Sequence, residues 1–291
     1  MKDAELFYAA KDKVGEGPNW NSETGKWYWV DISGKRIHIF DPVIKTDDTI
    51  PTDDIVAAIT FDKSGNIVAA LSNRLVRIDP KTKSASPICK IDSIPPNARI
   101  NDGKCDAAGR FWLGTMDLDE KEKIGSLYSV SPDLTCKKVL DGLIIGNGMA
   151  WTEDNKTMYY IDSPTLEIWA FDFDLAKGEL SGKRTIIKYG PGEGMPDGMT
   201  IDTEGMLWIA QFRGARVSRW NPRTGQRIAS YPIPTYNTTA CCFGGKNFDE
   251  LLVTSASVLM EGATEAQCAC AGSVFHLHPG VTGKAAFRFG G

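Results

Sequence analysis

Four oxygen-bearing side chains stand in one register of an internal repeat. Six segments of the sequence begin with an apolar anchor residue, and in four of them the residue four positions before the anchor carries a carboxylate or a carboxamide. The six residues in this register are Glu16, Ala57, Asn101, Asn147, Asp197 and Thr239. Repeated units are superimposable, so residues in equal register should take equal positions around one axis. Two carboxylates and two carboxamides are therefore expected to face a common point.

This set of side chains offers hard oxygen donors and contains neither sulfur nor imidazole. Such donors suit Ca²⁺, Mg²⁺ or Mn²⁺, whereas a Zn²⁺ site would normally include histidine or thiolate. Glycine lies within two residues of each donor, as in Gly146-Asn147-Gly148, and glycine lets the backbone approach an ion. Asn-Gly and Asp-Gly are also common turn dipeptides, so each motif alone would indicate a turn. Four such motifs in one register favour a site for one divalent metal ion, preferably Ca²⁺, over four turns that coincide by chance.

The spacing of the repeat indicates the elements that must position these donors. The anchors stand at positions 20, 61, 105, 151, 201 and 243, so successive anchors are 41 to 50 residues apart. This spacing suits a four-stranded blade of a β-propeller. Most units contain a second strand of alternating polarity that ends in a turn with proline, as in 37–42 and 75–80, because proline cannot continue a central ladder.

The sequence therefore predicts an all-β chain, folded as one six-bladed β-propeller domain over 1–291 with a metal at its central axis. Each donor should lie at the start of an innermost strand. The residues before Glu16 should supply a strand to the last blade and close the ring, since an open propeller would expose sheet edges.

The composition argues against several other classes of function. The 291 residues carry a net charge of −4 and no basic stripe, which argues against a nucleic-acid partner. The sequence also contains no apolar run of about 18 residues, the length needed to span a membrane. The seven cysteines form no C-x-x-C pair, so we expect reduced, buried side chains. The N-terminus lacks the apolar stretch of a signal peptide. These features favour a cytoplasmic protein with a small-molecule substrate.

Histidine and tryptophan are not expected in the site. His38, His276 and His278 are the only histidines, and all stand in second-strand segments away from the ring. No Gly-x-Ser-x-Gly motif is present, which argues against the triad of an α/β-hydrolase. Most of the eight tryptophans lie in strands or anchors and are predicted to pack between blades.

Six motifs run in order along nearly the whole chain. They are Gly15-Glu-Gly-Pro18, Arg99-Ile-Asn-Asp-Gly-Lys104, Gly114-Thr-Met116, Asn147-Gly-Met-Ala-Trp151, Pro196-Asp-Gly198 and Ala271-Gly-Ser-Val-Phe275. In these motifs the sequence resembles the senescence marker protein / gluconolactonase / luciferin-regenerating enzyme family, which includes regucalcin. The resemblance implies a six-bladed propeller with one divalent metal on its axis, in agreement with the repeat.

The resemblance also implies roles for individual residues. It makes Glu16, Asn147 and Asp197 the direct metal ligands. It gives Arg99 and Asn101 roles in binding substrate or a bridging water near the metal.

Two further acidic residues are implied to bind substrate. Asp102 stands beside Asn101 in the same loop. Some relatives contact substrate through an acidic residue shortly after the Gly-Thr-Met motif, and Asp119 is the matching position. The charged stretch 117–123 and the cysteine-rich stretch 265–271 depart from the family pattern, so the identity of the substrate stays open.

The predicted function is a divalent-metal-dependent hydrolase that opens small lactones, in particular sugar-acid lactones of the gluconolactonase type. Arg99 and Asn101 would orient the substrate and stabilise the developing oxyanion. In one mechanism Asp197 acts as the general base. In the other a metal-bound hydroxide attacks and Asp197 is only a ligand. The second is considered because a bound cation lowers the pKa of a carboxyl group and makes it a weaker base.

Two other functions remain open. The same site could act on another electrophile, such as a phosphotriester or a luciferin precursor, or the chain could be a non-catalytic calcium-binding regulatory protein. Arg99 favours catalysis over calcium buffering, because a cationic side chain beside the ion would weaken cation binding.

Overall fold

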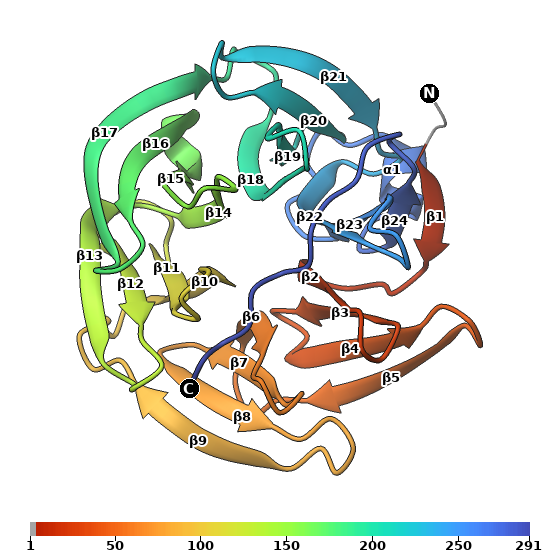
Figure 1. Cartoon of the computed structure of the whole chain (residues 1–291). Helices are drawn as coiled ribbons and strands as arrows, with labels where there is room; N and C mark the ends of the chain where they lie inside the picture. Colours follow the sequence, from red (N-terminus) through yellow and green to blue (C-terminus); the bar gives the residue numbers. More distant parts are fainter. Residues whose placement is uncertain (1–3) are drawn as a thin grey trace.

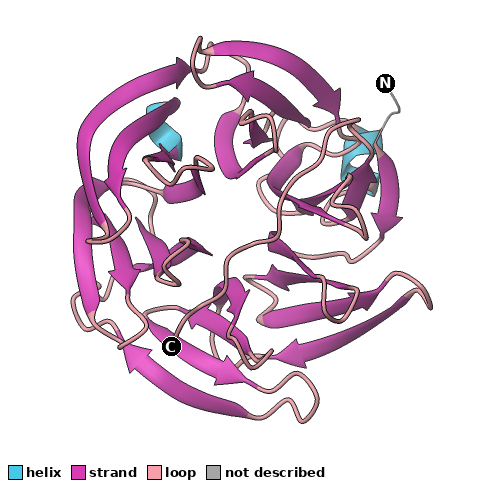
Figure 2. Ribbon diagram, in the orientation of Figure 1, coloured by secondary structure: helices cyan, strands magenta, loops and turns pink. Residues whose placement is uncertain are grey.

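Six four-stranded antiparallel sheets are arranged around a central axis like the blades of a propeller (Figure 1, Figure 2). The computed structural model describes residues 4–291. The all-β, six-bladed propeller predicted from the repeat is confirmed.

The strands of the first five blades follow one another along the chain. The first blade contains β2 (Gly15–Asn21), β3 (Lys26–Asp31), β4 (Arg36–Asp41) and β5 (Thr46–Pro51). The second contains β6 (Val56–Phe61), β7 (Ile67–Leu71), β8 (Arg74–Ile78) and β9 (Ala85–Lys90). The third contains β10 (Ala98–Cys105), β11 (Phe111–Asp117), β12 (Gly125–Val130) and β13 (Cys136–Leu143).

The fourth blade contains β14 (Gly146–Trp151), β15 (Thr157–Asp162), β16 (Glu167–Asp174) and β17 (Glu179–Lys188). The fifth contains β18 (Met195–Ile201), β19 (Leu207–Phe212), β20 (Arg216–Asn221) and β21 (Gln226–Pro232). The sixth contains β22 (Asn237–Gly244), β23 (Glu250–Ala256), β24 (Val274–Leu277) and β1 (Glu5–Tyr8). The helices of the described chain are η1 (Ser163–Thr165) and α1 (Glu265–Ala269), and neither has the length and apolar character needed to cross a bilayer.

The core lies between the blades. The innermost strands β6 and β14 are buried at every residue, whereas the outer strands β9 and β13 are mostly exposed. Within residues 4–291 the buried apolar side chains form six clusters, each of which joins two adjacent blades. Trp27 and Trp29 lie between the last and first blades, and Trp112 lies between the third and fourth. The tryptophans thus pack between blades as predicted.

The ring is closed by the N-terminal strand, as predicted. β1 pairs antiparallel with β24, with Leu6 opposite Phe275, and forms the outer edge of the sixth blade. The beginning and the end of the propeller therefore share one sheet.

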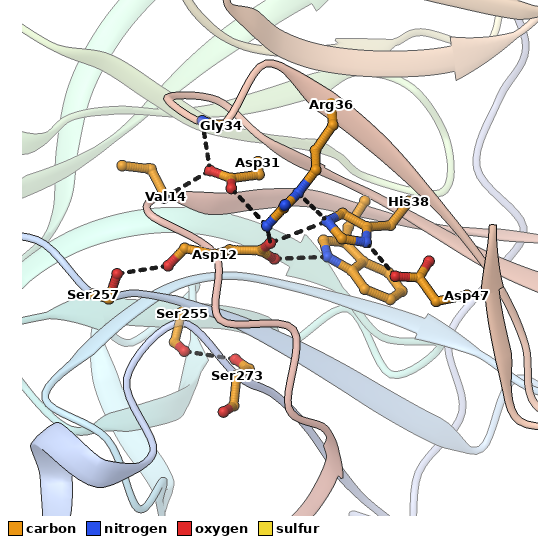
Figure 3. A network of polar contacts seen from close by, with 11 residues as sticks. Asp12, Val14, Asp31, Gly34, Arg36, His38, Asp47, Ser255, Ser257 and Ser273 are labelled. Atoms are coloured by element: carbon orange, nitrogen blue, oxygen red, sulfur yellow. Dashed lines mark hydrogen bonds and ion pairs between the residues drawn. The ribbon is translucent and has the colours of Figure 1, made fainter. Parts of the chain in front are cut away.

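A largely buried group of side chains, here called the closure clasp, holds the segment between β1 and β2 (Figure 3). It consists of Asp12, Trp29, Arg36, His38 and Asp47. The carboxylate of Asp12 accepts hydrogen bonds from Trp29 Nε1 and Arg36 Nη2, both at 2.9 Å, and lies 3.0 Å from His38 Nε2. His38 Nδ1 lies 2.7 Å from Asp47 Oδ2, and the imidazole stacks on Trp29. His38 is a strand residue away from the ring, as expected, but it is also part of a buried ion-pair network.

The clasp also reaches the sixth blade through the backbone of Asp12. The N–H of Asp12 donates to Gly272 O at 2.9 Å. Its carbonyl accepts from Ser257 Oγ at 2.7 Å (Figure 3). One residue therefore ties the first blade to the last.

The C-terminal segment 279–291, here called the strap, crosses the face of the propeller at which the innermost strands end (Figure 1). Backbone hydrogen bonds or ion pairs join it to one residue of each blade. These residues are Glu23, Phe61, Gly109, Glu153, Thr203 and Phe248. Phe289 of the strap is fully buried in the cluster between the second and third blades, so the strap is part of the core.

All seven cysteines are unpaired. Cys105 and Cys241 are buried, as predicted. The prediction of burial is wrong for Cys136 and Cys268. The former begins the solvent-facing strand β13, and the latter lies in α1, which has no buried residue.

Candidate metal centre

All six innermost strands are irregular at the register of the predicted ring. The pairing with the second strand of the blade is interrupted at or beside the ring residue. The interruptions lie between Glu16 and Asn19, Val56 and Ala58, Ile100 and Asp102, Gly146 and Met149, Pro196 and Met199, and Thr238 and Cys241. A β-bulge re-aims a side chain that would otherwise follow the pleat. Equal register in the sequence thus corresponds to equal structural position.

The three predicted ligands are buried at this register and come from three blades. Glu16 in β2, Asn147 in β14 and Asp197 in β18 are 6%, 5% and 8% exposed. Glu16 Oε2 accepts a hydrogen bond from Gly17 N at 2.7 Å. Buried carboxylates need compensating partners, and a single backbone donor leaves the second oxygen of Glu16 available to an ion.

The two carboxamides of the ring are held in opposite ways. Asn101 Oδ1 accepts from Arg99 Nη1 at 3.0 Å, and Asn101 Nδ2 donates to Gly146 O at 3.2 Å. A guanidinium only donates and a carbonyl only accepts, so these partners fix the amide orientation. Asn147 instead donates from Nδ2 to Ser163 Oγ at 2.9 Å, and its Oδ1 accepts no hydrogen bond from residues 4–291. The oxygen of Asn147 is therefore available to a cation, whereas that of Asn101 is already engaged.

The carboxyl groups of the ring repel one another. Burial raises the pKa of Glu16 well above its ordinary value, and the charges of Asp197 and Asp102 raise it further. Burial and the charge of Asp102 likewise raise the pKa of Asp197, against a hydrogen bond with the side chain of Asn147 that lowers it. Burial also raises the pKa of Asp102, against the opposing charge of Lys104. Ionisation of these groups together is costly without a cation among them.

Arg99 is the cationic side chain beside the ring. Burial lowers its pKa to about 10, against the opposing charges of Glu120 and Glu16. The guanidinium therefore stays charged at neutral pH. Its Nη1 is held by Ile100 O at 2.9 Å as well as by Asn101.

The donor set fits a hard divalent cation. Residues 4–291 contain no group of three or more His, Cys, Asp or Glu side chains placed to hold a metal ion. A cation at the ring therefore depends on the carboxamide of Asn147 as a third ligand beside Glu16 and Asp197. Carboxylate and carboxamide oxygens are ligands that Ca²⁺ accepts, and the free oxygen of Asn147 together with the crowded carboxylates provides them.

The loop between β11 and β12 carries two exposed acidic residues near the ring, and the substrate contact expected of Asp119 stays a prediction. Asp119 is exposed in a turn directly after β11. The neighbouring Glu120 is the residue whose charge acts on both Arg99 and Asp197. Sequence reasoning had singled out this charged stretch but missed Glu120, and it had no signal for Ser163, which lies outside the repeat register.

A cavity of about 810 Å³ lies on the side of the ring toward the strap. Asp102 and Lys104 line it, and strap residues 284–287 form part of its wall. None of the three predicted ligands is among its lining residues in the part of the chain that the structure describes. Because the strap covers this end of the channel, we expect substrate to reach the ring from the face at which the innermost strands begin.

The profile described as "SMP-30/Gluconolactonase/LRE-like region" matches residues 14–257. The chain belongs to this family. The family resemblance read from the six motifs is thereby confirmed, and the matched range contains every predicted ligand.

Full-length relatives support the assignment. Regucalcin of Danio rerio is 37% identical over 275 residues, which cover 94% of this chain and 93% of the relative. A solved luciferin-regenerating enzyme is 32% identical with a TM-score of 0.92, covering 97% of this chain and 96% of that chain. A structure described as the calcium-binding protein regucalcin from Agrobacterium tumefaciens has a TM-score of 0.93 at 24% identity, covering 99% and 97%, and shows the shared fold.

Proposed function

We propose that this family member is a divalent-metal-dependent hydrolase that opens small lactones. The observation that carries the proposal is the placement of Arg99 beside an oxygen ring suited to a cation. Its Nη1 is fixed by Ile100 O and Asn101 Oδ1, while Nε and Nη2 donate to no other group within residues 4–291. These donors are available to a substrate. A protein that only stores Ca²⁺ gains nothing from a fixed positive charge beside the ion, because the repulsion weakens binding.

In the proposed hydrolysis, each residue at the ring has a separate role. Glu16, Asn147 and Asp197 would hold the cation, which when bound polarises a carbonyl and makes water a stronger acid. Arg99 would stabilise the negative charge that develops on the carbonyl oxygen, and Asn101 would keep Arg99 in place. Asp197 is the candidate general base that takes the proton of the attacking water.

The proposed substrate class is a hydroxylated sugar-acid lactone, with Ca²⁺ as the preferred metal. The family description names gluconolactonase, and the regucalcin from A. tumefaciens is described as calcium-binding. The loop after β11 exposes Asp119 and Glu120, and carboxylates accept hydrogen bonds from sugar hydroxyls. Asp119 and Asp102 stay candidate substrate contacts.

Two alternatives have a specific observation in their favour. Similarity to a luciferin-regenerating enzyme over 97% of this chain favours the same site acting on a different electrophile. The relation to regucalcins favours a calcium-binding protein without turnover.

A pH-indicator assay of hydrolysis distinguishes the three. Gluconolactone, valerolactones and paraoxon are each incubated with Ca²⁺, Mg²⁺, Mn²⁺ or Zn²⁺, and rates are compared with buffer. We expect metal-dependent turnover of gluconolactone. Turnover of paraoxon alone would favour a site that acts on a different electrophile. Ca²⁺ binding in calorimetry, together with hydrolysis no faster than in buffer for every substrate, would favour a calcium-binding protein without turnover.

Matched variants link the rate to the ring. Glu16→Gln should remove the metal-dependent rate, because a ligand carboxylate is lost. Glu179→Gln removes an exposed carboxylate paired with Lys137 at 3.3 Å and should keep the wild-type rate. Equal rates in Glu16→Gln and wild type would contradict the proposed site.

A further inference from the structure

Ser163 is a buried hydroxyl that contacts the ring without belonging to it. It is the first residue of η1, directly after β15, and is 3% exposed. Its Oγ lies 2.9 Å from Asn147 Nδ2 and 2.6 Å from Pro196 O. Asn147 is a predicted ligand, and Pro196 directly precedes the ligand Asp197. One hydroxyl therefore bridges two ligand-bearing strands, β14 and β18, of adjacent blades.

The chemistry of these two partners fixes the proton of Ser163. A backbone carbonyl can only accept a hydrogen bond, so the single hydroxyl proton must point to Pro196 O. Ser163 Oγ is then an acceptor toward Asn147, which must present its NH₂ group. The carboxamide oxygen of Asn147 consequently points away from Ser163 and is left for the ring.

The position of Ser163 is itself fixed by its surroundings. Its N–H donates to Ile145 O at 3.1 Å. The preceding Asp162 accepts hydrogen bonds from the backbone of both Ile144 and Ile145, directly before β14. Pro164 follows in the first turn of η1 and restricts the backbone. The backbone of Ser163 is thus fixed against the segment that leads into β14, the strand that carries Asn147.

We propose that Ser163 is a positioning residue for the cation, which selects the amide orientation of Asn147 that presents oxygen. Without Ser163 the carboxamide can rotate by half a turn and present NH₂, a group that cannot ligate a cation. The inference rests on the metal site of the proposed function, but it does not depend on which substrate is hydrolysed.

The first test is Ca²⁺ binding to the whole chain, measured by isothermal titration calorimetry without substrate. Ser163→Ala should weaken Ca²⁺ binding by about 10- to 100-fold, the range seen when partners of metal ligands are removed. Ser255→Ala is the matched control, because Ser255 Oγ is also buried and donates to a carbonyl, Ser273 O, at 2.6 Å (Figure 3). It should bind Ca²⁺ as the wild type does.

A double-mutant cycle separates positioning from packing. Asn147→Asp replaces the carboxamide by a carboxylate, whose two oxygens are equivalent and need no orientation. In this background Ser163→Ala should change the Ca²⁺ affinity by less than about 2-fold. Ser163→Cys keeps the side-chain volume but is a weak donor and acceptor, and it should bind weakly like Ser163→Ala.

The outcomes that would overturn the proposal are distinct from failure of the lactonase proposal. Ca²⁺ affinity of Ser163→Ala equal to that of the wild type, wild-type affinity in Ser163→Cys, or an undiminished loss in the Asn147→Asp background would each refute positioning by Ser163. Absence of binding by the wild type to any divalent cation would refute the metal site together with the role of Ser163. Tight wild-type binding with no hydrolysis would refute the lactonase proposal and leave the role of Ser163 standing.

Discussion

Deprotonation of His38 should loosen the closure clasp and lower the free energy of unfolding at alkaline pH. Burial alone would lower the pKa of His38, but its hydrogen bonds to Asp12 and Asp47 outweigh burial and raise the pKa from 6.5 to about 9. A histidine whose pKa is higher in the folded state stabilises the fold while it is protonated. The stabilisation is fully present below pH 6.5 and is lost as the pH rises through about 9.

The size of the effect follows from these two pKa values. One pKa unit corresponds to about 1.4 kcal/mol, so the rise from 6.5 to about 9 gives about 3 kcal/mol. Tyr8 does not contribute below pH 9, because burial raises its pKa above the ordinary value of 10.0. Domains are stable by about 5–15 kcal/mol, so a loss of this size is readily measured.

The measurement is urea-induced unfolding followed by tryptophan fluorescence from about pH 6 to about pH 10. EDTA is present throughout so that metal binding does not contribute. His38→Gln removes the titrating group, and its stability should fall less steeply with pH than that of the wild type. His276→Gln is the matched control, since His276 is also a strand histidine but lies 3.6 Å from Glu5 at the edge of the sixth blade. The same pH slope in His38→Gln and wild type would refute the assigned role of His38.

Three further predictions concern the ring and the strap. Asp197→Asn keeps an oxygen for the metal and should retain Ca²⁺ affinity better than Asp197→Ala while losing turnover by about 100-fold or more; activity near wild type would rule out the base role and leave Asp197 a ligand. Arg99→Met should lower kcat/KM by about 100-fold without weakening Ca²⁺ binding in calorimetry, and a parallel loss of affinity would contradict a role toward substrate. Phe289→Ala should destabilise the fold by about 3–5 kcal/mol in urea unfolding, whereas Phe287→Ala, at an exposed strap residue, should change the stability by less than about 0.5 kcal/mol. A loss in Phe289→Ala as small as that expected for Phe287→Ala would contradict a stabilising role of the strap.

The fold and the ring were predictable because a repeat carries positional information. Equal register implied equal position, and the bulges beside Glu16, Asn147 and Asp197 show why. Each innermost strand leaves its pleat at the same place. Closure by the N-terminal strand was predictable for a different reason. An open propeller would leave an unpaired sheet edge, which natural proteins avoid.

The register could not predict that the two carboxamides, Asn101 and Asn147, are held in opposite orientations. Asn101 and Asn147 stand in equivalent positions, yet Arg99 occupies the oxygen of one and Ser163 occupies the NH₂ group of the other. Arg99 stands two residues before its partner and could be seen in the sequence. Ser163 comes from the turn after a neighbouring strand, 16 residues away, and a contact of that kind appears only when the blade is folded.

The interactions of Glu120 and His38 were not predicted, because each residue acts on partners that are distant in the sequence. The negative charge of Glu120 opposes the lowering of the Arg99 pKa by burial, and no signal in the sequence singled out this residue. Glu120 adopts a left-handed backbone with φ of 58° in the turn after β11, a conformation that the sequence did not indicate. His38 looked like an ordinary strand residue because its partner Asp12 lies 26 positions earlier, in a segment without any repeat signal.

The asymmetry of the ring fits the proposed hydrolase better than it fits a protein that only stores an ion. Ca²⁺ takes about 6–8 oxygen ligands, and Glu16, Asn147 and Asp197, from three of the six blades, can supply only part of them. In the second blade the ring position holds the methyl group of Ala57, and in the sixth the hydroxyl of Thr239 is committed to Gly15 O. The missing oxygens therefore fall beside Glu16, which leaves positions for water and substrate. Because Asn101 Oδ1 already accepts a hydrogen bond from Arg99, three of the six blades offer no free side-chain oxygen. A cation held at this ring would therefore keep coordination positions open to water and substrate, as the proposed hydrolysis requires.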